Sequence, residues 1–332
     1  MKLQKVRWGI ISTAKIGQTK VIPGIQKSNL CEVLAISSRD QKNAAEVAKE
    51  LSIPKAYGSY EDLLADPEID AIYNPLPNHL HVEWTIHAMK AGKHVLCEKP
   101  IALNATQAKI LLDESKKHPD LKVMEAFMYR FHPQWQAVKK LVQAGAIGQV
   151  KVVQSFFSYF NMDPNNVRNQ SDIGGGGLMD IGCYCISFPR FLFEEEPRRV
   201  VGLMDFDPNF KTDRIASGML DFSDGKSSLF TCSTQLAPFQ RCIVVGTEGC
   251  IEIEIPVNAP ADEATYINLI TQQESKKITF EIVDQYTLQA DAFAEAVQNN
   301  TNVPTPFEDA VGNMRVIDGI IESGKSGKWV RI

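Results

Sequence analysis

The first 127 residues alternate short apolar runs with amphipathic stretches. Val6–Ser12, Ala71–Pro75 and His94–Cys97 are apolar runs that end in small or turn-forming residues. Asn43–Leu51 and Val82–Ala91, which lie between such runs, have the spacing of amphipathic helices. Strands that alternate with short helices predict βαβ units, and therefore a parallel sheet with right-handed crossovers.

The pattern changes after Arg130. Pro133–Ala144 is helical, and the chain then becomes rich in alternating runs that predict strands. These runs follow one another with one helical interruption, Leu178–Phe193, so we expect an open, mainly antiparallel sheet. Thr247–Gly249 has the composition of a hairpin turn. The expected strands are Val150–Met162, Arg199–Asp205, Ile215–Phe222, Lys226–Thr234 and Cys242–Ile255.

The tail returns to helix at Gln285–Gln298 and at Phe307–Ser323. A length of 332 residues agrees with roughly two domains of ~150 residues each. We therefore predict an α/β protein with a doubly wound parallel sheet in residues 1–127 and an α/β domain with an open sheet in residues 128–332. The last helix, at about 306–323, is placed in the second domain, with packing back onto the first as the alternative.

The composition is that of an ordinary globular protein, with 44% hydrophobic and 23% charged residues. These fractions exclude long disordered and fibrous chains. The 35 lysines and arginines and 40 aspartates and glutamates give a net charge of -5 and form no basic cluster. Nucleic acid is therefore not an expected partner. The longest apolar runs fall short of the ~18 residues of a membrane span, so no membrane association is expected.

The N-terminus and the cysteines bear on the cellular compartment. Met1–Arg7 leads directly into the first apolar run, without the apolar core of an export signal. Seven cysteines is an odd number for a long chain of this kind. We therefore expect reduced thiols in a cytoplasmic protein.

The turn after the first strand is a candidate dinucleotide site. Such a site uses G-x-G-x-x-G, because glycine lets the backbone approach the pyrophosphate and the next helix N-terminus stabilises its charge. This chain has Ser12-x-Ala14-x-x-Gly17 instead. On the motif alone, an ordinary βα turn remains as good an interpretation. The expected cofactor contacts in the turn are Ser12, Thr13, Ala14, Lys15 and Ile16.

The end of the second expected strand, Val33–Ser38, addresses the choice between NAD and NADP. It contains Ser37, Ser38, Arg39 and Asp40 in succession. Serine hydroxyls and a guanidinium suit a 2′-phosphate, because arginine binds phosphate with two parallel hydrogen bonds. We expect Asp40 to cap the helix that follows it. NADP is therefore favoured over NAD.

Lys99 follows the strand His94–Cys97, within Glu98-Lys99-Pro100. Ligands of an open parallel sheet bind beyond the carboxyl ends of the strands, so Lys99 is expected to face that crevice. Its ammonium group can bind a substrate oxygen and stabilise negative charge as hydride moves. A surface lysine before a loop is the alternative, and for an isolated Lys-Pro it is the better one.

Asp180 and Tyr184 follow the run Gly174–Gly177 and share one helical face. A carboxylate can orient a phenol, and a phenol beside a lysine can exchange a proton. The alternative is a capping aspartate with a core tyrosine. The glycines favour close approach of a ligand or of the other domain, or form a flexible loop.

Metal chemistry finds little support in the sequence. His79 and His81 lack further ligands at suitable spacing, so a polar loop at the cofactor is the better interpretation. Cys183 and Cys185 lack the second pair of a zinc ribbon. No metal site is expected.

Taken together, the motifs closely resemble the Gfo/Idh/MocA family, named for glucose–fructose oxidoreductase, inositol dehydrogenase and a rhizopine-catabolism protein. The resemblance covers nearly the whole chain and is greatest to the NADP-using xylose 1-dehydrogenases, dihydrodiol dehydrogenases and nucleotide-sugar 3-ketoreductases. The motifs that carry it are Ser12–Gly17, Ser37–Arg39, Pro75–His81, Gly92–Val95, Glu98–Pro100, Glu125–Arg130, Gly175–Gly177 and Asp180–Tyr184.

The resemblance implies a Rossmann domain and a substrate domain whose open sheet forms a homodimer or homotetramer. It implies reversible hydride transfer between NADP(H) and a carbinol or carbonyl of a sugar. Lys99 would bind the reacting oxygen, and Tyr184, where many members have histidine, would exchange the proton beside Asp180. Further cofactor contacts would be Leu76, Asn78, His81 and Glu98, and substrate contacts would be Arg168 and Arg130.

Two other functions stay open. A trans-dihydrodiol dehydrogenase shares the chemistry but takes another substrate. A non-catalytic NADP-sensing regulator would keep the cofactor turn, although Lys99, Asp180 and Tyr184 together argue against it.

Overall fold

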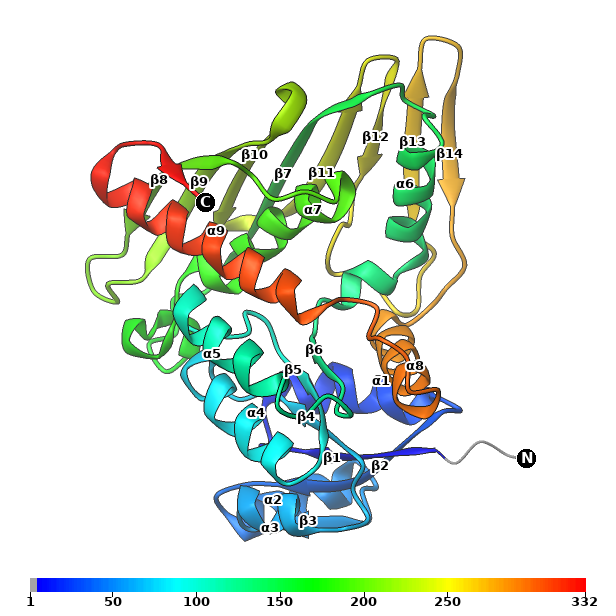
Figure 1. Cartoon of the computed structure of the whole chain (residues 1–332), viewed down its shortest axis with the longest axis vertical. Coiled ribbons are helices and arrows are strands. Elements are labelled where there is room, and N and C mark those ends of the chain that lie inside the picture. The colour runs from blue at the N-terminus through cyan, green and yellow to red at the C-terminus, as the bar shows by residue number, and fades with distance from the viewer. Residues whose placement is uncertain (1–4) are drawn as a thin grey trace. The chain divides into compact units, whose positions relative to one another are not determined.

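The protein is described by a computed structural model that covers residues 5–332 (Figure 1). Met1–Gln4, which belong to the stretch expected to lack an export signal, lie outside the described residues. The chain forms two compact units. The first contains residues 5–128 and Asp284–Val311, and the second contains Tyr129–Val283 and Gly312–Ile332.

The described part of the first unit contains a six-stranded sheet in the order β3-β2-β1-β4-β5-β6. All of its neighbouring strands pair in parallel. The order is that of a doubly wound dinucleotide-binding sheet, which confirms the predicted fold class. The strands are β1 (Val6–Ile10), β2 (Cys31–Ser37), β3 (Lys55–Tyr57), β4 (Ala71–Asn74), β5 (His94–Cys97) and β6 (Val123–Glu125). The helices are α1 (Ile22–Lys27), α2 (Gln41–Glu50), α3 (Tyr60–Ala65), α4 (His81–Lys90), α5 (Ala105–Ser115) and α8 (Gln285–Gln298).

Helix α8 lies beside α1 in the first unit, although it is far away in sequence (Figure 1). Phe293 packs against Trp8 with ring centroids 5.3 Å apart. A Cβ at Gly24 of α1 would lie 2.7 Å from the Cβ of Tyr286, so glycine permits the close approach of these helices. The sequence places residues 284–311 in the second domain, whereas the structure groups them with the first unit. Helical periodicity identifies a buried face but not the sheet that the face covers.

The described part of the second unit contains a nine-stranded sheet in the order β14-β13-β12-β11-β7-β10-β9-β8-β15. Strands β7 and β10 pair in parallel. The other neighbouring strands described here pair antiparallel, as predicted. The strands are β7 (Val150–Phe160), β8 (Arg199–Phe206), β9 (Asp213–Asp221), β10 (Ser227–Ser233), β11 (Gln235–Gly246), β12 (Gly249–Ile253), β13 (Tyr266–Thr271), β14 (Ser275–Thr279) and β15 (Val330–Arg331). The helices are α6 (Pro133–Gln143), α7 (Cys183–Phe193) and α9 (Phe307–Ser326), the last of which belongs to this unit from Gly312 onward.

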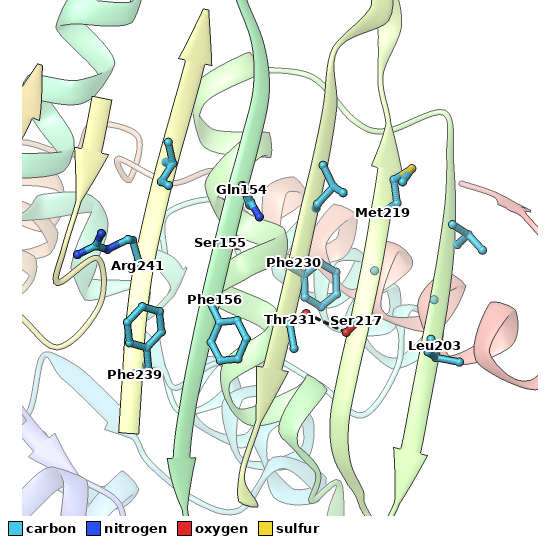
Figure 2. A pocket seen from close by; sticks show the side chains of 15 residues that line it. Gln154, Ser155, Phe156, Leu203, Ser217, Met219, Phe230, Thr231, Phe239 and Arg241 are labelled. Carbon is cyan, nitrogen blue, oxygen red and sulfur yellow. Dashed lines mark hydrogen bonds between the residues drawn. The ribbon is translucent and has the colours of Figure 1, made fainter. Parts of the chain in front are cut away.

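The two faces of this sheet differ. Helix α7 packs against β7 and β10 on one face, where Val153 and Phe157 are buried. The other face presents Leu203, Met219 and other apolar side chains around a hollow of about 570 Å³ (Figure 2). The side chain of Leu203 is 77% exposed. We call this surface, which includes Phe156, Leu203, Met219, Leu229 and Phe239, the open sheet face.

Two further features of residues 5–332 bear on the sequence predictions. Within this range, no helix combines the length and apolar character needed to cross a membrane. All seven cysteines carry free thiols, and Cys250 is the one that is not buried.

Candidate functional site

The turn between β1 and α1 has the backbone that a dinucleotide needs. Ser12 has φ = 75°, in the left-handed region where glycine is favoured, and it stands where the motif has its first glycine. Helical structure begins at Lys15 and includes a π-helical stretch, Gly17–Val21, before α1. The backbone N–H groups at the start of this helix form the kind of site that binds phosphate.

A network of side chains ties this turn to the end of β2. Asn43 of α2 donates its amide to Thr13 Oγ1 (2.8 Å) and to Ser38 Oγ (3.3 Å). Gln18 donates to the carbonyl of Thr13 (2.6 Å). Sequence analysis missed Asn43 and Gln18 because each belongs to a helix whose pattern explains it without any further role. They hold the turn in shape from either side.

The predicted NADP-recognition residues have the surroundings that this role requires. The carboxylate of Asp40 accepts from the backbone N–H of Lys42 (2.9 Å) and caps α2, as predicted. The side chain of Arg39 is exposed, and its guanidinium lies near the hydroxyl of Tyr60. Ser37 is buried and donates to the carbonyl of Ile10 (3.3 Å), whereas Ser38 lies beside Asn43. The donor set at this edge therefore fits a phosphorylated ribose.

His81 has a different place from the one that the sequence analysis gave it. Its imidazole is fully buried, with Nδ1 2.8 Å from the carbonyl oxygen of Pro100 and Nε2 2.6 Å from that of Leu76. Burial lowers the pKa of His81 to about 4, so the ring is neutral and donates to one of the two carbonyls. His81 therefore ties the loop after β4 to the loop after β5. Leu76 is also buried, and Asn78 begins a short 3₁₀ turn as a half-buried residue.

Lys99 follows β5 directly, and it is half-buried. The Lys99–Pro100 peptide is cis. The preceding carboxylate, Glu98, accepts from the hydroxyl of Tyr73 (2.8 Å). Burial, and then the charge of Glu98, raise the pKa of Tyr73, which keeps its phenol protonated and donating. Tyr286 of α8 also has a pKa that is raised by burial and by Glu98. Two tyrosines that the sequence analysis did not consider thus surround the carboxylate beside Lys99.

The second unit brings Asp180, Arg168 and Tyr159 together. Asp180 lies in a π-helical stretch, Leu178–Gly182, that leads into α7. Its Oδ2 is 2.8 Å from Arg168 Nε and accepts from the hydroxyl of Tyr159 (2.6 Å). The charge of Asp180 raises the pKa of Arg168, and burial together with Asp180 raises that of Tyr159. Tyr159 was not among the predicted site residues, because it is one aromatic among several in a strand.

Tyr184 belongs to the same cluster. It follows Asp180 by four positions along the helix, and it also contributes to the raised pKa of Arg168. The ring of Tyr184 is 5% exposed and lies edge-on to the rings of Tyr129 (5.9 Å) and Phe157 (6.1 Å). Asp180, Arg168 and the phenol of Tyr159 thus meet at the start of the helix, and Tyr184 follows on the same helix among aromatic rings.

The glycines before this helix approach their own unit closely. A Cβ at Gly175 would lie 2.6 Å from the carbonyl oxygen of Arg168, and a Cβ at Gly176 would lie 2.0 Å from Asp213 Oδ1. The sequence analysis expected such glycines to admit a ligand or the other domain. In the structure they admit the Arg168 loop and a buried carboxylate that the sequence analysis missed.

Arg130 is buried and takes part in a hydrogen-bond network. Its guanidinium donates to Ser187 Oγ (2.6 Å) and to the hydroxyl of Tyr129 (3.3 Å). It also lies over the ring of Phe191, 5.4 Å from the ring centre. Because these partners already bind its guanidinium, we do not include Arg130 in the proposed substrate site.

Metal ligation was also considered. Residues 5–332 contain no group of three or more histidine, cysteine, aspartate or glutamate side chains placed to hold a metal ion.

Comparison with known proteins agrees with this geometry. Residues 6–127 match the model of an oxidoreductase family with an NAD-binding Rossmann fold. Residues 135–252 match that of the GFO/IDH/MocA C-terminal domain. The chain is 38% identical over 326 residues to D-xylose 1-dehydrogenase (NADP(+)) 2 of Haloferax volcanii, covering 98% of this chain and 99% of that protein.

Two further relatives extend the comparison. The chain is 34% identical over 253 residues to trans-1,2-dihydrobenzene-1,2-diol dehydrogenase of Xenopus laevis, covering 74% of each. It matches the crystal structure of KijD10, a 3-ketoreductase from Actinomadura kijaniata in complex with NADP and TDP-benzene, with a TM-score of 0.90. That match has 26% identity and covers 96% of this chain and 98% of that chain. These relatives come from the branches that the motifs resemble. The chain therefore belongs to the Gfo/Idh/MocA family of oxidoreductases, with an NAD(P)-binding Rossmann fold in its N-terminal part.

Proposed function

We propose that this oxidoreductase uses NADP(H) and acts on a carbinol or carbonyl carbon of a sugar. The observation that carries the proposal is the cluster of Asp180, Arg168 and Tyr159 in the second unit, on the helix that carries Tyr184 four positions after Asp180. It offers hydrogen-bond acceptors, donors and an exchangeable proton, which is what a polyhydroxy substrate requires. The relatives named D-xylose 1-dehydrogenase and 3-ketoreductase support the same substrate class.

The preference for NADP rests on Ser38, Arg39 and Asp40. Arg39 is exposed and carries the positive charge that a 2′-phosphate would bind. The carboxylate of Asp40 caps α2, so its charge is directed at the backbone N–H of Lys42. The cofactor would lie along Ser12–Ile16, with its phosphates at the helix that begins at Lys15.

The chemical roles follow from the side chains. When bound, NADP(H) supplies or accepts the hydride. The ammonium of Lys99 binds the reacting oxygen of the substrate and stabilises negative charge on it. Tyr184 takes the hydroxyl proton as a phenolate during oxidation and returns it as a phenol during reduction. Asp180 holds Arg168 and Tyr159 and presents its remaining lone pairs to substrate hydroxyl groups. Arg168 is a substrate contact.

We also propose that the open sheet face is the interface of a homo-oligomer. Its apolar side chains are exposed in the single chain, and Leu203 and Phe239 are 77% and 51% exposed. A contiguous apolar surface of this kind is typical of an interface. A second copy of the same chain would cover the face with its own open sheet face in a two-fold arrangement.

The test begins with the wild-type protein. NADPH and NADH are titrated by fluorescence, and D-xylose, other aldoses, inositols and trans-diols are then screened for reduction of NADP⁺. We expect tighter binding of NADPH and turnover of an aldose. Turnover of trans-diols alone would favour a dihydrodiol dehydrogenase, and NADPH binding without any turnover would favour a sensing regulator.

The second step tests the mechanism with Lys99→Met. This variant should bind NADPH almost as the wild type does and lose most of its turnover, because the oxygen of the substrate loses its positively charged partner. Lys15→Met, in the cofactor turn, is the matched control: it should weaken NADPH binding and change kcat much less. An unchanged kcat in Lys99→Met would refute the proposed role of Lys99.

A further inference from the structure

The helix that carries Asp180 and Tyr184 begins without a capping side chain of its own. Glycines occupy its start, and Gly177 provides no side-chain hydrogen bond there. The first N–H groups of a helix have no partner within the helix, so another group must satisfy them. The carbonyl of Gly176 accepts from the N–H of Asp180 (3.0 Å), which makes this glycine the first residue of the helical hydrogen-bond series.

Asp213, the first residue of β9, supplies the missing cap. Its Oδ2 accepts from the N–H of Leu178 at 2.6 Å, although the two residues are 35 positions apart. Asp213 is 6% exposed, so solvent does not replace it. An aspartate is among the best capping residues, because its side-chain oxygen accepts from the first N–H groups of a helix.

Glycine at position 176 makes room for this carboxylate. Gly176 has φ = 117°, and a Cβ there would lie 2.0 Å from Asp213 Oδ1. Gly177 has an ordinary helical backbone with φ = −66°, and a Cβ there would lie 3.4 Å from Asp213 Oδ2. The two neighbouring glycines therefore differ: the first has to be glycine for Asp213 to fit, and the second does not.

The same segment fixes the Arg168 loop. The N–H of Gly176 donates to the carbonyl of Arg168 and that of Gly175 to the carbonyl of Gln170, both at 2.9 Å. The side chain of Arg168 then pairs with Asp180, one turn into the helix. Gly175, Gly176 and Asp180 thus connect the Arg168 loop with the start of the helix. Asp213 connects the start of the helix with the sheet.

We propose that Asp213 is a positioning residue of the active site, which fixes the start of the helix and with it the placement of Asp180 and Tyr184. The carboxylate holds the first turn at the edge of β9, and the sheet register determines where that edge lies. The inference rests on the proposed catalytic roles of Asp180 and Tyr184. In this proposal the buried Asp213 acts through the helix.

The test compares Asp213→Asn and Asp213→Ala with Asp207→Asn. Asp207 is a matched control, because it is also a buried capping carboxylate of the second unit, which accepts from Asn209 and Phe210 in the turn after β8. We measure hydrogen exchange over residues 174–190, the melting temperature, the Kd for NADPH, and kcat and KM with the best aldose. The exchange measurement does not depend on activity.

We expect Asp213→Ala to exchange at least tenfold faster at the helix start and to have a kcat at least tenfold lower, with the Kd for NADPH within twofold. Asp213→Asn, which keeps the shape and one acceptor oxygen, should recover part of the kcat. Asp207→Asn should lower the melting temperature while leaving kcat within twofold. Unchanged exchange in Asp213→Ala would overturn the capping role, and unchanged kcat despite faster exchange would overturn the positioning role.

A second pair of variants serves if Asp213→Ala does not fold. Gly176→Ala should displace the carboxylate and reproduce the loss of kcat, whereas Gly177→Ala should leave kcat within twofold. Equal kcat values for these two variants would contradict the proposal. If the wild-type protein turns over none of the sugars, the proposed function fails, and the exchange experiment still decides whether Asp213 holds the helix.

Discussion

Replacement of Arg39 by alanine tests how the protein distinguishes NADP from NAD. Arginine binds a phosphate with two charge-assisted hydrogen bonds, and bonds to charged groups contribute ~1.5–3 kcal/mol each in partly buried settings. Arg39 is exposed, so solvent screening reduces this contribution. A net loss of about 1.5–2 kcal/mol remains, which corresponds to a rise of roughly 10- to 30-fold in the Kd for NADPH.

The Kd for NADH should stay within about twofold, because NADH has no 2′-phosphate for Arg39 to bind. The assay is fluorescence titration with both cofactors at a fixed salt concentration, repeated at higher salt. The difference between wild type and Arg39→Ala should shrink as the salt concentration rises.

Asp40→Ala is the control for this experiment. Asp40 caps α2 through the N–H of Lys42, so its loss should lower the free energy of unfolding by about 1 kcal/mol. Its effect on the two cofactors should be similar for both. If Arg39→Ala weakened NADPH and NADH binding equally, the assignment of Arg39 to the 2′-phosphate would be refuted.

Three further predictions concern pH, assembly and packing. The pKa of His81 is about 4 in the folded protein against 6.5 when unfolded, so its contribution is present above about pH 6.5 and is lost as the pH falls towards 4. In the wild type, His81 accounts for a loss on the order of 3 kcal/mol of unfolding free energy over this pH range. Chemical unfolding should therefore show a smaller acid loss of stability for His81→Asn than for wild type or for His87→Asn, which changes an exposed histidine. Leu203→Glu should give a smaller particle in light scattering, unlike Ile110→Glu, which changes another exposed apolar residue (53%); equal masses would rule out the open sheet face as the interface. Gly24→Ala should lower the melting temperature by several degrees, because its Cβ would lie 2.7 Å from that of Tyr286, and an unchanged value would show that α8 moves freely.

Most strands of the parallel sheet could be predicted because they are short, apolar and separated by helices, whereas β3 was missed because its three residues are only half-buried. The four residues of β4 are all buried, which gives the continuous apolar run typical of a parallel strand. The antiparallel sheet was predicted in outline only. Strand β14 was missed because it is polar and largely exposed and therefore lacks alternation, and β13 was missed although it alternates.

The candidate site was predictable where a residue type is unusual for its position, and not where a contact joins distant segments. Lys99 after a buried strand and Asp180 beside Tyr184 could be identified from the chain itself. Asp213 could not, because its role depends on the sheet register that brings it to Leu178. His81 was expected to contact the cofactor because of the segment in which it lies. Its burial between the carbonyl oxygens of Leu76 and Pro100 shows that it connects two loops.

The packing of α8 on the first unit has a consequence for synthesis of the protein on the ribosome. Trp8 is fully buried and lies against Phe293. The residue that shields it from water is therefore synthesised 285 positions later. A nascent chain of the first 128 residues would leave this indole and the neighbouring face of α1 in contact with water. The first unit is thus completed only after strands β7 to β14 of the second unit have been synthesised, and before β15. A gene fragment that stops at residue 128 should accordingly yield an aggregation-prone product, and one that adds α8 through a linker should remedy this.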